Sequence, residues 1–164
     1  MTIIAVVGAS DCSPHESEMA EAVGRGLAEA GATLICGGRG GVMAAACRGA
    51  RAAGGLTIGV LPGINAAEAN PDVDVPLVTG LGEARNVIIV HTAQAVIAVG
   101  GEFGTLSEIA FALKLGRPVI GLKTWQLAKR GQPSQAIVCA ATPHEAVRLA
   151  LETCAASTGA GAME

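Results

Sequence analysis

The stretch Val99-Gly100-Gly101-Glu102-Phe103-Gly104-Thr105-Leu106-Ser107-Glu108 decides the fold of this chain. It follows an apolar run, residues 95–99, which is typical of a buried parallel strand. It opens a segment whose apolar residues recur at helical spacing and which stops at Gly116-Arg117-Pro118. The stretch therefore predicts a glycine turn between the carboxyl end of a strand and the amino end of a helix.

A turn of this kind is suited to binding an anion. Backbone N–H groups in the first turn of a helix have no intrahelical partner, and the helix dipole adds positive potential there. We therefore expect the protein to bind a phosphorylated small molecule, and a nucleotide in particular. The residues expected to contact the phosphate are Gly100, Gly101, Gly104 and Thr105.

Strand and helix patterns alternate along the whole chain. Strands are predicted at residues 3–7, 33–36, 56–61, 75–78, 95–99, 119–122 and 136–139. Helices are predicted at residues 14–31, 42–54, 82–91, 105–115 and 143–155, with a loop at 62–71. This alternation predicts an α/β fold, a three-layer, Rossmann-like, doubly wound and mostly parallel sheet of six or seven strands. Residues 1–156 are expected to form one domain, and 157–164 a disordered tail.

Three glycine-bearing turns follow predicted strands, at residues 8–10, 37–41 and 100–105. In doubly wound sheets, ligands bind beyond the carboxyl ends of the strands, where the strand order reverses. The first two turns add further expected ligand contacts: Gly8, Ser10, Gly37, Gly38, Arg39 and Gly40. The dinucleotide fingerprint G-x-G-x-x-G and the P-loop are both absent, and no acidic residue ends the second strand to hold a ribose hydroxyl. NAD-dependent redox chemistry is therefore disfavoured.

Composition excludes several classes of partner. The net charge is −3, and Trp125, Phe103 and Phe111 are the only aromatic residues. A nucleic-acid partner is not expected, because single-strand binders need stacking rings and a basic groove. The five cysteines form no C-x-x-C pair and predict reduced, buried thiols in a cytoplasmic protein. No transmembrane run, signal peptide or metal-ligand spacing is present, so neither a membrane nor a metal is expected.

Three segments resemble a known superfamily. They are Cys36-Gly37-Gly38-Arg39-Gly40-Gly41-Val42-Met43, Thr79-Gly80-Leu81-Gly82-Glu83-Ala84-Arg85-Asn86 and the stretch 99–108. The chain resembles, over residues 3 to 122, the Rossmann-like group that contains the LOG phosphoribohydrolases (labelled "lysine decarboxylase-like"), the molybdenum cofactor carriers and the DprA/Smf-related proteins. The resemblance is closest to the DprA/Smf-related, carrier-like branch. It implies a homodimer or a homotetramer, in agreement with the large apolar fraction.

The resemblance implies roles for individual residues. In LOG enzymes a P-G-G-x-G-T-x-x-E motif and an Arg-Lys pair help to cleave the bond between a base and ribose 5′-phosphate. The conserved charges match Arg85 and Glu108. This chain has valine at position 99 in place of the motif's proline, one extra residue in the loop, and Asn86 in place of the lysine. These departures leave phosphate binding in place and weaken the inference of hydrolysis.

Two charged residues have alternative interpretations. The T-x-x-E spacing makes Glu108 either the partner in a capping box or an acid/base at a glycosidic bond. Arg85 lies near a helix start, where positive charge is unfavourable, so either a surface salt bridge or a contact with phosphate or Glu108 must compensate. Asn86 is a candidate neighbour of the ribose or the base.

Two functions from different classes remain open. The first is hydrolysis of the N-glycosidic bond of a nucleoside 5′-monophosphate, which needs no cofactor. The second is a non-catalytic carrier or sensor for a nucleotide or a phosphorylated cofactor such as the molybdenum cofactor. A DNA-processing role is disfavoured by the acidity and the few aromatic residues, and lysine decarboxylation by the absence of a candidate Schiff-base lysine.

Overall fold

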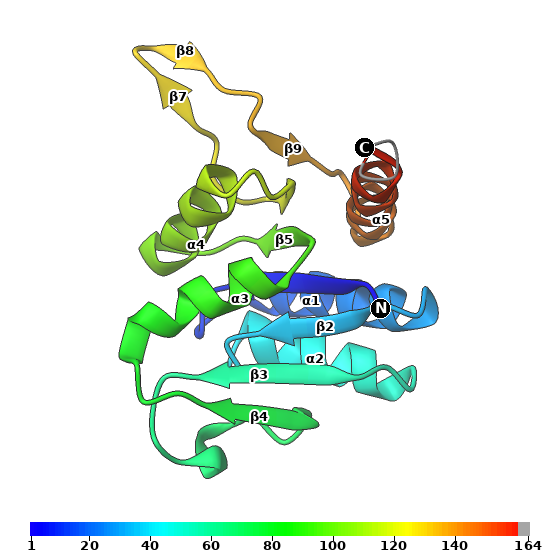
Figure 1. Ribbon diagram of the computed structural model, residues 1–164, viewed down its shortest axis with the longest axis vertical. Coiled ribbons are helices and arrows are strands. Elements are labelled where there is room, and N and C mark those ends of the chain that lie inside the picture. The colour runs from blue at the N-terminus through cyan, green and yellow to red at the C-terminus, as the bar shows by residue number, and fades with distance from the viewer. Residues whose placement is uncertain (161–164) are drawn as a thin grey trace.

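A computed structural model describes residues 1–160 of the chain, and of residues 157–160 it describes only the backbone. Within this part, seven strands form one sheet in the order β4-β3-β2-β1-β5-β6-β9 (Figure 1). Every neighbouring pair in it is parallel. The strands are β1 (Ile3–Gly8), β2 (Thr33–Cys36), β3 (Thr57–Leu61), β4 (Val75–Val78), β5 (Ala95–Val99), β6 (Val119–Leu122) and β9 (Ile137–Cys139). The predicted α/β class is confirmed.

The strand order reverses between β1 and β5. From β1 the chain builds outward through β2, β3 and β4, and from β5 it builds the other way through β6 and β9. Gly8 at the end of β1 is in register with Val99 at the end of β5. The turns that follow these two residues therefore start side by side, at the point where doubly wound sheets bind ligands.

Helices cover both faces of the sheet. On one face lie α1 (Pro14–Glu29), α2 (Val42–Ala52) and α5 (Pro143–Ala160), and on the other α3 (Asn86–Thr92) and α4 (Phe103–Lys114) (Figure 1). Successive strand residues point to opposite faces. In β1, Ile4 and Val6 pack with the first group of helices, and Ala5 and Val7 with the second. The central strands are thus buried on both sides, as their continuous apolar runs predict, whereas the edge strand β4 is exposed.

Helices α1 and α2 pack closely against each other. A Cβ atom at Gly24 would lie 1.9 Å from the carbonyl oxygen of Ala46, and one at Gly49 would lie 1.9 Å from that of Glu21. Only glycine permits this approach. The start of α1 carries the predicted capping box, in which Ser13 and Glu16 each accept a backbone N–H of the other.

Several boundaries differ from the predictions. The predicted helix 82–91 is a 3₁₀ turn, η2 (Gly82–Arg85), followed by α3, and α4 begins at Phe103 rather than at residue 105. The predicted loop 62–71 contains a 3₁₀ turn, η1 (Ala66–Glu68). A hairpin of β7 (Ala128–Lys129) and β8 (Gln132–Pro133) has no signal in the apolar pattern because its residues are exposed. Helix α5 continues to Ala160, past the predicted end at residue 155.

Two further expectations concern the end of the chain and the thiols. The backbone of residues 157–160 continues α5, and residues 161–164 lie outside the described part. The predicted disordered tail at 157–164 stays a prediction, as does the assignment of 1–156 to one domain. Cys36 and Cys47 are buried as expected, but the thiol of Cys139 is exposed, because β9 is an edge strand. Across residues 1–160, no helix is long and apolar enough to cross a membrane.

Candidate functional site

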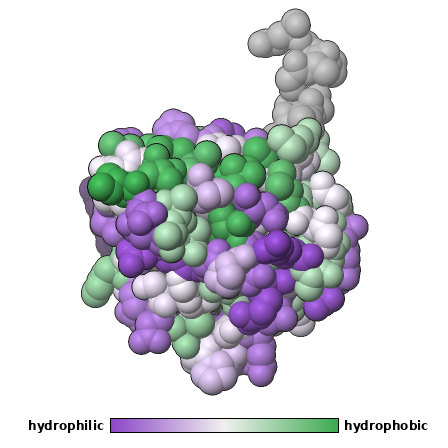
Figure 2. Space-filling view, turned by 90° about the horizontal axis from the view of Figure 1, so that it is seen from below, coloured by the Kyte–Doolittle hydropathy of each residue, from purple (hydrophilic) through white to green (hydrophobic). Residues whose placement is uncertain are grey.

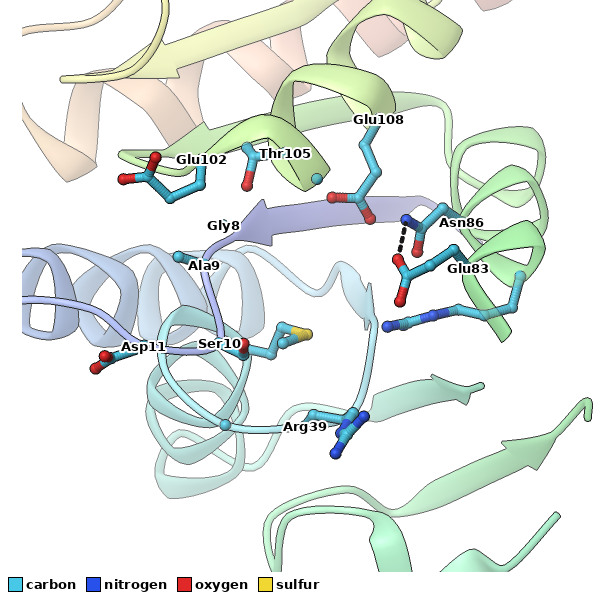
Figure 3. Close-up of a pocket in the computed structure, with 14 residues that line it drawn as sticks. Gly8, Ala9, Ser10, Asp11, Arg39, Glu83, Asn86, Glu102, Thr105 and Glu108 are labelled. Carbon is cyan, nitrogen blue, oxygen red and sulfur yellow. Dashed lines mark hydrogen bonds between the residues drawn. The ribbon is translucent and has the colours of Figure 1, made fainter. Parts of the chain in front are cut away.

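A cavity of about 560 Å³ lies beyond the carboxyl ends of the strands, at the reversal of strand order (Figure 3). It collects residues from all three predicted turns and from the Arg85 segment. The predicted site residues that line it are Gly8, Ser10, Arg39, Gly40, Arg85, Asn86, Gly104, Thr105 and Glu108. It is also lined by Ala9, Asp11, Met43, Glu83 and Glu102. We call this cavity the switch-point pocket.

Two predicted glycines of the second turn do not line the pocket. A Cβ atom at Gly37 would lie 2.2 Å from Nη1 of Arg85, so this glycine makes room for the arginine. Gly38 has φ +73°, and its N–H donates to Sγ of Cys36 at 3.3 Å. Both glycines therefore lie outside the lining of the pocket, and their contact with a ligand stays a prediction.

Gly100 and Gly101 also lie outside the switch-point pocket. The N–H of Gly100 donates to the carbonyl oxygen of Leu122 at 3.0 Å, which extends the pairing of β5 with β6, so Gly100 has no N–H to offer an anion. Their φ values of +52° and +99° are ones that favour glycine. Both residues line a separate cavity of about 280 Å³, together with Glu16, Glu102, Lys123, Thr124 and Trp125.

The backbone N–H groups available to an anion lie after Gly100 and Gly101, at the start of α4. The first helical hydrogen bond of α4 runs from the N–H of Leu106 to the carbonyl oxygen of Glu102, at 3.0 Å. The N–H groups of residues 103–105 therefore precede the hydrogen-bonded ladder. The side chain of the N-cap residue, Glu102, does not cap them. Gly104 and Thr105 both line the pocket, so the positive end of α4 faces it.

Glu108 is buried, with 8% of its surface exposed. The capping-box interpretation is wrong, because α4 begins at Phe103 and Glu108 is then too far from the N-cap to reach it. Burial raises the pKa of Glu108 to about 7, the positive charge of Arg85 lowers it, and the negative charge of Glu83 raises it. A carboxyl group with this pKa can both give and take a proton near neutral pH.

Arg85 is buried as well, with 6% exposed, so the surface salt-bridge interpretation is wrong. Its Nη1 donates to the carbonyl oxygen of Val60 at 2.8 Å, while its Nε has no partner among the described residues. Burial lowers the pKa of Arg85, and the charges of Glu108 and Glu83 raise it. No carboxylate in residues 1–160 lies within the 4.0 Å of an ion pair with Arg85. A buried charge held without an ion pair is costly and is typical of functional sites.

Glu83 is a pocket residue that the sequence interpretation missed. It lies on η2, two residues before Arg85, and that proximity is the signal that could have found it. Nδ2 of Asn86 donates to Oε2 of Glu83 at 3.5 Å, and Oδ1 of Asn86 is buried without a donor in the described part of the chain. Figure 3 shows the side chains of Glu83, Asn86 and Glu108 turned toward one another.

The described residues form neither a metal centre nor a sulfur-rich site at the pocket. No group of three or more His, Cys, Asp and Glu side chains in the described residues is arranged to hold a metal ion. Among the described residues that line the pocket, Met43 alone has a sulfur atom, and it is 7% exposed. Arg39, which also lines the pocket, lies on an exposed turn. Its backbone carbonyl oxygen accepts a hydrogen bond from Nδ2 of Asn70 at 2.9 Å. The pocket is therefore a polar cavity with charges of both signs.

The raised pKa of Glu108 predicts that stability falls as pH rises. Its pKa is about 7 in the fold against an ordinary value of 4.5. Below pH 4.5 both folded and unfolded states hold the proton, and the full stability is present. Stability is lost as pH rises through 7, by at most about 3 kcal/mol. In thermal unfolding at pH 5 and pH 8, Glu108→Gln should lose less stability with rising pH than the wild type. Equal losses in both would contradict the burial argument.

The fold and the site together define a Rossmann-like α/β protein with a polar pocket at the switch point of its sheet. The chain belongs to the SLOG cluster4 family, whose sequence profile matches residues 1–147. It is 48% identical to a protein of Archaeoglobus fulgidus over 120 residues, which cover 73% of this chain and 79% of that protein. It is 35% identical to a cytokinin riboside 5′-monophosphate phosphoribohydrolase of Mycobacterium marinum, over 66% of this chain and 59% of the enzyme.

Solved structures of related proteins have the same fold. The molybdenum cofactor binding protein of Rippkaea orientalis superposes with a TM-score of 0.82 at 37% identity, covering 92% of this chain and 96% of that one. The molybdenum cofactor carrier protein of Chlamydomonas reinhardtii superposes with a TM-score of 0.82 at 36% identity, covering 94% and 99%. The expected resemblance to the superfamily is confirmed. DNA processing protein A of Helicobacter pylori, at 17% identity, shows the fold alone, so the exclusion of nucleic acid stays a prediction.

Proposed function

We propose that the switch-point pocket binds a nucleoside 5′-monophosphate and hydrolyses its N-glycosidic bond. One observation carries this proposal: Glu108 and Arg85 are both buried at the same cavity, yet they form no ion pair with each other in the described structure. Two opposite buried charges that are kept apart leave room for a ligand between them. The raised pKa of Glu108 equips it for proton transfer near neutral pH.

The phosphate end of the ligand belongs at the start of α4. The N–H groups of Gly104 and Thr105 precede the helical ladder, and both residues line the pocket. A Cβ atom at Gly104 would meet nothing within 4 Å, so the backbone there is open to a ligand. Arg85 bonds to Val60 at the end of β3 and passes beside Gly37 at the end of β2. From that side the positive charge of Arg85 offsets the negative charge of the phosphate, and its guanidinium offers further hydrogen-bond donors.

The reaction uses Glu108 as acid and then as base. Protonated Glu108 gives its proton to a nitrogen of the base while the C1′–N bond breaks, and the electron pair of that bond leaves with the base. Water bonds to C1′ and returns a proton to Glu108. The products are the free base and ribose 5-phosphate. No cofactor enters, and the phosphoribohydrolases among the relatives are named for this bond cleavage.

A second candidate is a carrier of the molybdenum cofactor, favoured by structural neighbours at 36–37% identity that carry or bind it. This cofactor is a phosphorylated pterin, and the pocket fits it. Gly104 and Thr105 would hold its phosphate, and Asn86, whose Oδ1 lacks a donor among the described residues, would hold an N–H group of the pterin. The bound group would supply redox chemistry only after transfer to another protein. Asn86 in place of the lysine of the LOG motif also favours this candidate.

Incubation of the purified protein with AMP separates the two candidates. Chromatography of the mixture should show adenine and ribose 5-phosphate, and calorimetry should show binding of AMP but not of adenosine. Binding without product would overturn hydrolysis in favour of a carrier. Absence of binding by every 5′-phosphorylated nucleoside and by molybdopterin would overturn both candidates.

We also propose that the chain forms a homodimer or homotetramer. Strand β4 lies at an edge of a parallel sheet, a position in which both faces are usually covered, yet all its residues are exposed. Ile64 and Leu81, which are 87% and 54% exposed, add to its apolar surface. Figure 2 views the molecule from the side that carries β4 in Figure 1 and shows hydrophobic residues gathered over part of this face. Light scattering should give two or four times the chain mass of 16.2 kDa, and a monomer would contradict the proposal.

A further inference from the structure

The switch-point pocket contains a carboxylate that the proposed reaction does not use. Glu83 is exposed at the pocket wall, and Figure 3 shows it turned toward Glu108 and Asn86. Its negative charge acts on both Glu108 and Arg85. Two carboxyl groups in one corner disfavour an anion there and favour a ligand group that donates hydrogen bonds.

The backbone before Glu83 is held in place. Gly80 and Gly82 have φ values of +64° and +56°, which turn the chain sharply after β4. Their N–H groups donate to the carbonyl oxygens of Gly63 at 2.9 Å and Pro62 at 3.0 Å. The turn is therefore tied to the segment that follows β3, and it brings Glu83 to the pocket in a defined position.

Asn86 orients the Glu83 carboxylate. Its Nδ2 donates to Oε2 of Glu83, which sets the direction of the amide and leaves Oε1 without a contact from Asn86. The buried Oδ1 of Asn86 has no donor in the described part of the chain. This corner of the pocket is thus rich in acceptors.

The sugar of a bound nucleotide would lie at this level. Glu108 follows Thr105 by three residues of α4, a helical rise of about 4.5 Å. If Gly104 and Thr105 hold the phosphate, the ribose attached to that phosphate would lie at the level of Glu108. Neighbouring hydroxyls of a ribose are two donors, and an ionised carboxylate accepts both.

We propose that Glu83, oriented by Asn86, accepts hydrogen bonds from the 2′- and 3′-hydroxyls of the ligand's ribose and selects ribonucleotides over 2′-deoxyribonucleotides. This proposal rests on the nucleotide binding proposed above and needs no catalysis. It places an acidic ribose contact on η2, whereas dinucleotide-binding folds carry theirs at the end of the second strand.

Calorimetric titration of AMP and 2′-deoxy-AMP tests the proposal. The wild type should bind AMP about 10- to 100-fold more tightly than 2′-deoxy-AMP, because the deoxynucleotide lacks a hydrogen bond to a charged group. In Glu83→Gln this preference should fall to within about threefold, because a neutral acceptor is weaker. Glu102→Gln is the matched control. It removes the same charge at the end of the pocket where α4 begins, and it should change the affinity for both nucleotides by the same factor.

The outcomes separate this proposal from the proposed function. If the wild type binds no AMP, nucleotide binding itself fails, and the proposal fails with it. If AMP binds and Glu83→Gln keeps the wild-type preference for AMP over 2′-deoxy-AMP, the selection by Glu83 is overturned and nucleotide binding stands. Inosine 5′-monophosphate lacks the amino group of AMP. If Glu83→Gln changes only the preference between AMP and inosine 5′-monophosphate, Glu83 contacts the base, and the proposed ribose contact is overturned. Thermal unfolding confirms that each variant is folded.

Discussion

Replacement of Glu108 by glutamine is expected to slow the cleavage of AMP by about 10²- to 10⁴-fold, the usual contribution of general acid–base catalysis. Glutamine has nearly the same shape and can still hydrogen-bond to the ligand, but it cannot transfer a proton. The Kd for AMP should therefore stay within about threefold of the wild-type value, as for an interaction made mainly in the transition state. Single-turnover assays with detection of free adenine, and calorimetry for the affinity, give the two quantities.

The control for this experiment is Glu18→Gln, which makes the same change of charge on the exposed surface of α1. It should keep the wild-type rate. Wild-type turnover in Glu108→Gln would remove Glu108 from the mechanism. The wild-type rate should also fall as pH rises above 7, because Glu108, with a pKa of about 7, then loses the proton that it donates.

Replacement of Arg85 by methionine should weaken the binding of AMP by about 10- to 100-fold, since it removes charge-assisted hydrogen bonds of about 1.5–3 kcal/mol. Methionine is apolar and removes a buried charge that has no ion pair in residues 1–160. The melting temperature should therefore stay the same or rise. Loss of affinity without loss of stability is the signature of a residue retained for a ligand.

Arg25→Met, on the exposed surface of α1, is the matched control and should leave the affinity unchanged. Calorimetry and thermal unfolding of both variants provide the measurements. The opposite pattern, in which Arg85→Met unfolds easily and binds AMP normally, would show that Arg85 acts in the fold, through Val60 and Gly37.

Local sequence was a good guide wherever a pattern depends on neighbours in the chain. The strands at 33–36, 75–78, 95–99 and 119–122 have the predicted bounds, because their apolar runs end at glycine, proline or polar residues. The capping box of Ser13 and Glu16 likewise involves residues three positions apart. The start of α4 was missed by two residues, because the cap is the backbone of Glu102 and no side chain marks it.

For the candidate site too, features that depend on neighbours in the chain were predictable and features that depend on distant segments were not. The sequence by itself determined the α/β fold and the three glycine turns, and it singled out Arg85 and Glu108 as candidate site residues, because these follow from periodicity, turn chemistry and recurring motifs. Only the tertiary structure decided that the N–H of Gly100 is used by β6, that Gly37 makes room for Arg85, and that Glu83 reaches the pocket. Burial and hydrogen bonding depend on segments far apart in the chain. The same residue types can therefore serve a ligand or the fold according to what packs beside them.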